Sequence, residues 1–182
     1  MIRGAIFDLD GTLLDSMSIW DTIGEDYLRS LGIEPRENLR ETFATFTLEQ
    51  AARYYQEHYG VALSVPEILR GIEDMVASAY QQTVPLKAGA ADFLRALKER
   101  GVSLCVATVT PEPLARAALR RLNVLPLFRD ILTCAAVGHG KEEPHIYRAA
   151  LERLQTKRCE TAVFEDALHA LATARADCFG AV

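Results

Sequence analysis

Short apolar runs that stop abruptly at polar or turn residues recur along this chain, and they constrain its fold more than any other feature. The four runs lie at 4–7, 102–107, 130–134 and 161–164. Such runs are typical of strands that are buried on both faces of a parallel sheet. Helical patterns lie between these runs, at 90–100, 113–122 and 144–154. The alternation predicts an α/β fold with a doubly wound parallel sheet.

Residues 16–84 interrupt this alternation with helical patterns and no convincing strand. The patterns lie at 18–31, 36–43, 47–59 and 65–82, and turn signals flank the whole segment at Gly11, Pro85 and Gly89. A chain of 182 residues is long enough for one medium domain or for a core with a small insertion. The interruption favours the second arrangement. We therefore expect an α/β core domain formed by 1–15 and 85–182, with a small all-helical domain at 16–84.

Charge and composition exclude several classes of protein. The chain has 25 acidic and 20 basic residues, and the basic ones are scattered apart from short clusters. This pattern does not indicate a nucleic-acid surface. No apolar run reaches 18 residues, too few residues precede Asp8 for a signal peptide, and the four cysteines form no C-x-x-C pair. We expect a cytoplasmic monomer with reduced cysteines that binds neither membranes nor nucleic acids.

The strongest motif is Asp8-Leu9-Asp10-Gly11-Thr12, directly after the first predicted strand. Two carboxylates at a strand end can take different roles, one as a nucleophile and the other in proton transfer. Gly11 lets the backbone turn sharply beside them. The alternative is a simple Asp-Gly turn with Asp8 as a helix cap.

Three further elements end or follow predicted strands. Thr108 could hold a phosphate oxygen, Lys141 could reach a transferred phosphoryl group, and Glu165-Asp166 could bind Mg²⁺. Taken singly, a threonine in this place is usually a helix cap and a loop lysine is usually solvated, and Glu165-Asp166 could be a second cap. Their joint occurrence favours one shared site, because ligands of open α/β sheets bind at the carboxyl ends of the strands.

Together, the D-x-D-G-T motif, the strand-terminal Thr, the G-K-x-x-P lysine and the strand-terminal Glu-Asp resemble the four motifs of haloacid dehalogenase-like hydrolases. The resemblance spans 4–182. The helical insert after the first motif resembles the cap domain of the branch that contains β-phosphoglucomutase and phosphoglycolate phosphatase. The resemblance implies a Rossmann-like core with a helical cap.

The resemblance also implies a role for each motif residue. Asp8 is the expected nucleophile and Asp10 the expected acid/base. The expected phosphate-binding residues are Gly11, Thr108 and Lys141. The expected Mg²⁺ ligands are Asp8, Asp10 through its carbonyl, Asp166 and, nearby, Glu165.

These roles predict a magnesium-dependent phosphatase that hydrolyses a small phosphorylated metabolite, such as a sugar phosphate, through a phospho-aspartate. One alternative is a β-phosphoglucomutase-type phosphotransferase. Mutase relatives carry a phosphate-binding arginine where this chain has Thr47-Leu48-Glu49, which favours the phosphatase. Another alternative is a catalytically silent binding protein with the same fold.

Two further groups of residues lie near these motifs. Residues of the insert are expected to set specificity, among them Met17, Trp20, Phe46 and Thr47. His139 and His145 flank Lys141. They are expected to be surface or supporting groups, because the resemblance gives them no role.

Overall fold

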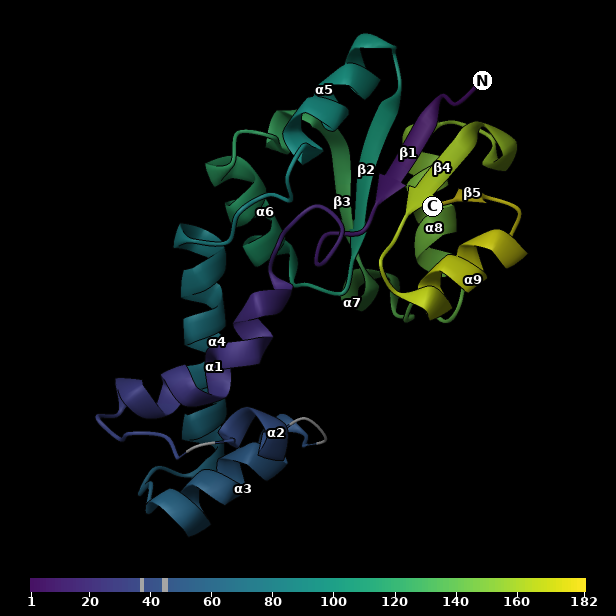
Figure 1. Ribbon diagram of the computed structural model, residues 1–182. Helices are drawn as coiled ribbons and strands as arrows, with labels where there is room; N and C mark the ends of the chain where they lie inside the picture. Colours follow the sequence, from purple (N-terminus) through teal and green to yellow (C-terminus); the bar gives the residue numbers. More distant parts are fainter. Residues whose placement is uncertain (37, 44–45) are drawn as a thin grey trace. The chain divides into compact units, whose positions relative to one another are not determined.

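A computed structural model of the chain describes residues 1–36, 38–43 and 46–182 (Figure 1). It divides into two compact units. One is formed by Met1–Ser16 and Tyr80–Val182, and the other by Met17–Ala79. No helix in the described residues is long and apolar enough to span a membrane.

The first unit is built on a five-stranded sheet with the order β3-β2-β1-β4-β5, in which every pair of neighbours is parallel. The strands are β1 (Gly4–Phe7), β2 (Ser103–Thr108), β3 (Phe128–Thr133), β4 (Thr161–Phe164) and β5 (Gly180–Ala181). Phe7 at the end of the central strand lies opposite Val106 of β2 and Phe164 of β4. The residues that follow β1, β2 and β4 therefore leave the sheet at one edge.

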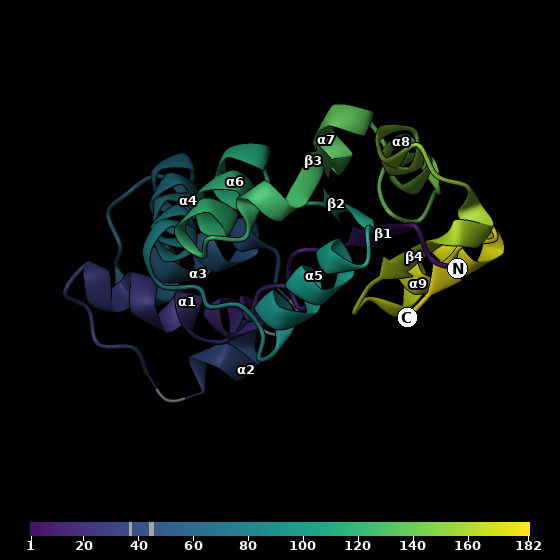
Figure 2. The same cartoon turned by 90° about the horizontal axis from the view of Figure 1, so that it is seen from above.

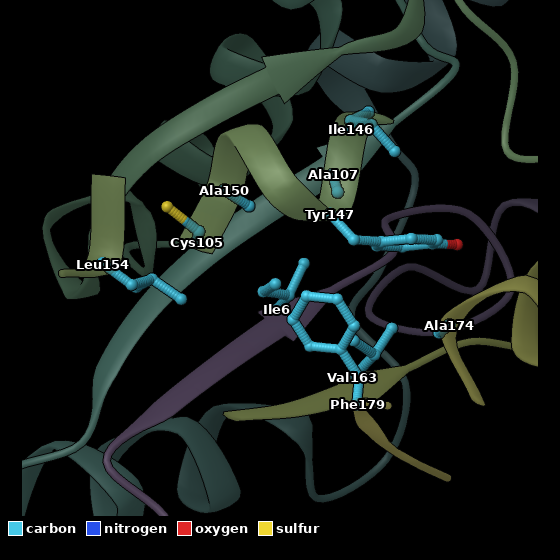
Figure 3. Packing of buried hydrophobic residues seen from close by; sticks show 10 residues of the cluster. All are labelled: Ile6, Cys105, Ala107, Ile146, Tyr147, Ala150, Leu154, Val163, Ala174 and Phe179. Atoms are coloured by element: carbon cyan, nitrogen blue, oxygen red, sulfur yellow. The ribbon is translucent and has the colours of Figure 1, made fainter. Parts of the chain in front are cut away.

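Helices cover both faces of this sheet, as the views of Figures 1 and 2 show. They are α5 (Ala90–Glu99), α6 (Glu112–Arg121), α7 (Cys134–Val137), α8 (His145–Leu154) and α9 (Leu168–Ala176). Successive side chains of a strand point to opposite faces. Accordingly, Ile6 lies in a cluster with Ile146 and Tyr147 of α8 (Figure 3). The Phe7 ring instead contacts Phe93 of α5, with the ring centroids 6.2 Å apart.

The second unit is helical. It contains α1 (Met17–Ser30), α2 (Leu39–Phe43), α3 (Leu48–Tyr59) and most of α4 (Val65–Gln82), whose last turn belongs to the first unit. Thr47 and Gln50 form a capping box at the start of α3, and Gly60 ends the helix at φ 66°. The core of this unit is made by Tyr27, Leu28, Leu39, Ala52, Tyr55, Val61, Ile68 and Ile72.

The predicted fold class is confirmed, since the chain has a doubly wound parallel sheet and an inserted all-helical domain. Residue 37, in the predicted helix at 36–43, lies outside the described residues, and α2 begins at Leu39. The sequence analysis did not name α9. Its buried residues are only Ala170 and Ala174, so its apolar periodicity is weak. The structure divides at 16/17 and 79/80, and the domain boundaries at 15/16 and 84/85 remain predictions.

Gly71 in α4 provides a test of packing in the helical unit. A Cβ atom at this position would lie 2.7 Å from Cε2 of Tyr27, which is buried. Glycine to alanine usually stabilises a helix by about 1 kcal/mol. Here the overlap with Tyr27 should outweigh that gain in stability. We expect Gly71→Ala to lower the free energy of unfolding by about 1–3 kcal/mol, measured by urea denaturation. Ser78→Ala, at an exposed position of the same helix, is the control and should be neutral or stabilising. Equal stability of the two variants would contradict the packing.

Candidate active site

Asp8 lies at the centre of the edge where the strands end. It follows β1 directly, it is only 5% exposed, and its N–H donates to the Phe164 carbonyl at 2.9 Å. This bond extends the pairing of β1 with β4 by one residue. The backbone of Asp8 is thus fixed by the sheet, and its carboxylate is held at the carboxyl end of the central strand.

Lys141 places a buried positive charge against this carboxylate. It lies between α7 and α8 and is 6% exposed. Its Nζ donates to Oδ1 of Asp8 and, at 2.7 Å, to Oε1 of Glu165. The Tyr147 hydroxyl donates to the same Glu165 oxygen at 2.8 Å. One ammonium group therefore bridges two carboxylates that come from the ends of β1 and β4.

The buried setting changes the proton affinity of these groups. Burial raises the pKa of Asp8 to about 7, and Glu165 also raises it, whereas the ion pair with Lys141 acts in the opposite direction. Burial alone would lower the pKa of Lys141. The charges of Asp8 and Glu165 outweigh that effect and raise it. Lys141 is therefore charged at neutral pH, and Asp8 titrates in that range when no other cation is present.

The site has more negative charge than Lys141 can neutralise. Asp8, Glu165 and Asp166 each offer a carboxylate oxygen, and these oxygens all lie within 4.8 Å of one another. Oε2 of Glu165 is buried without a hydrogen-bond partner. A buried, unpaired carboxylate oxygen is unfavourable, and a cation would satisfy it. Because all the donors are oxygens, the set fits a hard ion such as Mg²⁺.

Gly11 allows Asp166 to approach the loop that follows Asp8. Its φ is +82°, and a Cβ atom there would lie 2.1 Å from Oδ2 of Asp166. The positive φ favours glycine, and any larger residue would displace the Asp166 carboxylate. The Gly11 N–H donates to the Leu14 carbonyl at 3.0 Å, so it is used within the loop. Phosphate binding by Gly11 stays a prediction.

The carboxylate of Asp10 is surrounded by hydroxyl groups. It accepts hydrogen bonds from the side chains of Ser16 at 2.6 Å, Tyr80 and Thr110. Ser16 and Tyr80 are the last and first residues of the first unit at its two connections to the helical unit. Neither residue was predicted from the sequence as a partner of Asp10. Tyr80 lies 70 residues away in an amphipathic helix, and that pattern gives no sign of the contact.

Thr108 is fully buried at the end of β2, and its hydroxyl accepts a hydrogen bond from the Thr110 N–H at 3.0 Å. The Thr110 hydroxyl in turn donates to Asp10. The structure thus brings Asp8, Lys141, Glu165 and Asp166 together in one cluster. Thr108 and Asp10 are linked to each other through Thr110.

The helical unit has a pocket of its own, with a volume of about 380 Å³. Trp20, Phe46 and Thr47 line it, whereas Met17 does not. Arg40, which also lines it, pairs with Asp21 at 2.6 Å. The pocket thus combines aromatic surface with this ion pair and one further carboxylate, that of Glu25.

The sequence of the chain matches a known protein family. The sequence profile of haloacid dehalogenase-like hydrolases matches residues 2–176. The chain belongs to this family. It is 31% identical to Protein CbbY of Cereibacter sphaeroides over 96% of this chain and 80% of that protein. It is 23% identical to hexitol phosphatase B of Escherichia coli over the same shares of the two chains.

A solved structure shows the same fold. A putative β-phosphoglucomutase from Thermotoga maritima superposes with a TM-score of 0.88 at 23% identity, covering 99% of this chain and 84% of that one. Two predictions are thereby confirmed: the chain belongs to this family, and it is a hydrolytic enzyme. The roles of the individual site residues remain predictions.

Lys141→Met should destabilise the protein more at high pH than at low pH. The pKa of Asp8 is about 7 in the folded chain against an ordinary 3.8. A carboxyl group with a raised pKa binds more protons when folded, so its contribution makes stability fall as pH rises from about 4 to 7. Lys141 limits that loss of stability, because its charge stabilises the ionised form of Asp8. Without it, two buried carboxylates stay unpaired, and we expect a loss of about 3 kcal/mol near pH 8 and clearly less near pH 5.5.

The measurement is denaturant unfolding at both pH values in the presence of a chelator. Lys87→Met is the control, because the Lys87 side chain forms an exposed ion pair with Asp15 at 3.5 Å, and the loss of such a pair should change stability little. Equal losses at the two pH values for Lys141→Met would contradict the coupling of Lys141 to Asp8.

Proposed function

We propose that this protein is a magnesium-dependent phosphatase that hydrolyses a small phosphorylated metabolite, a sugar phosphate, through a phospho-aspartate on Asp8. The observation that carries the proposal is the cluster at the strand ends, in which the buried side chains of Asp8, Lys141 and Glu165 lie beside the exposed Asp166. The name of hexitol phosphatase B, a relative over nearly the whole chain, supports the choice of reaction and substrate class.

In the first step, a carboxylate oxygen of Asp8 attacks phosphorus in line with the leaving oxygen. The bond between phosphorus and that oxygen breaks, and Asp10 gives the departing alcohol its proton. Lys141 remains protonated and offsets the charge of the phosphoryl oxygens. In the second step, Asp10 removes a proton from water as the water attacks the acyl phosphate. Inorganic phosphate leaves and Asp8 is regenerated.

The oxygens of Asp8, Glu165 and Asp166, with the Asp10 carbonyl, would hold the Mg²⁺ ion. When bound, the ion would supply the positive charge that this acidic cluster lacks, and it would polarise the phosphate. Glu165 already accepts hydrogen bonds from Lys141 and Tyr147 through Oε1. Its unpaired Oε2 is therefore the oxygen left for the ion or its water shell.

Asp10 must present its proton in one direction, and its three hydroxyl partners can set that direction. Ser16, Tyr80 and Thr110 donate to both oxygens of the carboxylate. We assign them as positioning residues, since they act through Asp10.

Asp8→Asn should lower turnover of an aryl phosphate by at least about 1,000-fold, because an amide is not a nucleophile for phosphorus. Phosphate release in the presence of Mg²⁺ is the measurement. Asp15→Asn is the matched control, since Asp15 lies on the same chain segment but its side chain pairs with Lys87 in an exposed ion pair. A chelator should stop wild-type turnover and added Mg²⁺ should restore it. Near-normal activity of Asp8→Asn would show that Asp8 is not the nucleophile.

The pocket of the helical unit leads to a prediction about the substrate. We expect a small sugar phosphate to be hydrolysed at least about tenfold faster than a phosphopeptide of similar charge, because a cap domain that covers the site admits small substrates. Trp20→Ala should alter the ratio among small sugar phosphates with little effect on the Mg²⁺ dependence, since Trp20 lines that pocket and none of the proposed metal ligands lies in the helical unit.

Steady-state kinetics with both substrates provides the test, and Leu63→Ala is the control because Leu63 is an exposed residue of the same unit that does not line the pocket. Faster hydrolysis of the peptide would contradict a cap over the site. Interconversion of sugar phosphates without release of phosphate would instead indicate the mutase.

A further inference from the structure

The segment that carries Lys141 also carries three side chains that the proposed phosphatase reaction does not use. His139 and Glu143 flank Lys141 at a distance of two residues in the sequence, and His145 begins α8. All three side chains are substantially exposed, between 41% and 58%. Lys141 between them is buried. The cluster therefore lies on the outer side of the chain segment whose central residue enters the site.

The three side chains converge on one carboxylate oxygen. Oε2 of Glu143 lies 3.0 Å from Nε2 of His145 and 3.4 Å from Nδ1 of His139. The two imidazole rings are stacked with their centroids 4.0 Å apart. One ligand atom from each residue lies within 4.8 Å of the others. The cluster thus has the composition of a two-histidine, one-carboxylate site.

These separations can be compared with those in a metal site. A tetrahedral Zn²⁺ ion with bonds of about 2.0–2.1 Å keeps neighbouring ligand atoms about 3.3 Å apart. Both nitrogen-to-oxygen distances in the cluster are within a few tenths of an ångström of that value. The two nitrogens lie within 4.8 Å of each other, and the stacked rings must rotate so that both nitrogens face one ion. Hydrogen bonds from His139 and His145 lower the pKa of Glu143, so its carboxylate is charged and can offset part of the charge of an ion.

We propose that His139, Glu143 and His145 form a second metal site, selective for Zn²⁺ or a similar transition ion and distinct from the Asp8 cluster. Imidazole nitrogens favour Zn²⁺, whereas Mg²⁺ prefers oxygen ligands. Three protein ligands leave one position for water. Because the ligands come from both sides of Lys141, the bound ion closes a ring around 140–142. It restrains the backbone that positions the Lys141 ammonium group.

The test is calorimetric titration of Zn²⁺ into the full chain, stripped of metal and supplied with excess Mg²⁺ to occupy the all-oxygen site. The exposed thiols of Cys159 and Cys178 are alkylated first, since thiolates also bind Zn²⁺. We expect one Zn²⁺ per chain with a dissociation constant in the micromolar range or below. The double variant His139→Ala/His145→Ala should weaken binding by about 100-fold or more, because two of three ligands are lost.

His169→Ala is the matched control. His169 also lies near an acidic side chain of this segment, with Nε2 3.8 Å from Oε1 of Glu142, but it is not one of the three ligands. Glu143→Gln provides a second variant that keeps both histidines. Amide hydrogen exchange gives a readout independent of activity. Zn²⁺ should slow exchange at 139–145 in the wild type and in His169→Ala, and not in the double variant.

Two results would overturn the proposal. One is wild-type binding of Zn²⁺ no tighter than that of the double variant. The other is an equal loss of binding in His169→Ala, which would place the ion elsewhere on the surface. Neither result depends on whether the protein is a phosphatase, so this site and the proposed function can fail separately.

Discussion

The ion pairs of Lys141 with Asp8 and Glu165 are the interaction on which the site depends. Three ionisable groups are buried at the end of a parallel sheet, and none of them could remain charged there alone. The lysine reaches them from a segment outside the sheet, and Tyr147 supplies a further hydrogen bond from α8. The ends of β1 and β4, the lysine segment and α8 are thus held together by charge as well as by the apolar cluster beneath them.

The parallel register of the strands brings these charged residues together at one end of the sheet. Because Phe7 pairs with Val106 and Phe164, β1 and β4 end at the same level and β2 ends two residues further on, at Thr108. The polar residues that follow these strands therefore lie at the same end of the sheet. The apolar cluster that contains Ile6, Ile146 and Val163 lies between the sheet and α8 (Figure 3). A rigid, densely packed layer below and unbalanced negative charge above suit a site that binds a cation together with an anionic ligand.

Much of this arrangement could be predicted from the sequence, because the strands are short apolar runs whose polar ends have distinctive residue types. Asp8, Lys141, Glu165 and Asp166 were all named, and the structure places them in one cluster. The hydroxyl partners of Asp10 were missed for a physical reason. The Tyr80 contact depends on where a long helix ends relative to the sheet, and no periodicity in the helix contains that information. α9 was missed because its small buried residues give almost no apolar signal.

The close approach of Gly11 and Asp166 has a consequence for the redesign of this protein. An added methyl group at position 11 would overlap the aspartate oxygen, and a longer acidic or imidazole side chain at 166 would meet the Gly11 backbone from the other direction. The two positions are therefore co-dependent. Exchange of Asp166 for glutamate or histidine, to alter which ion the cluster accepts, would have to be accompanied by a rebuilt loop after Asp8. Neither position can take a larger side chain on its own without displacing the other.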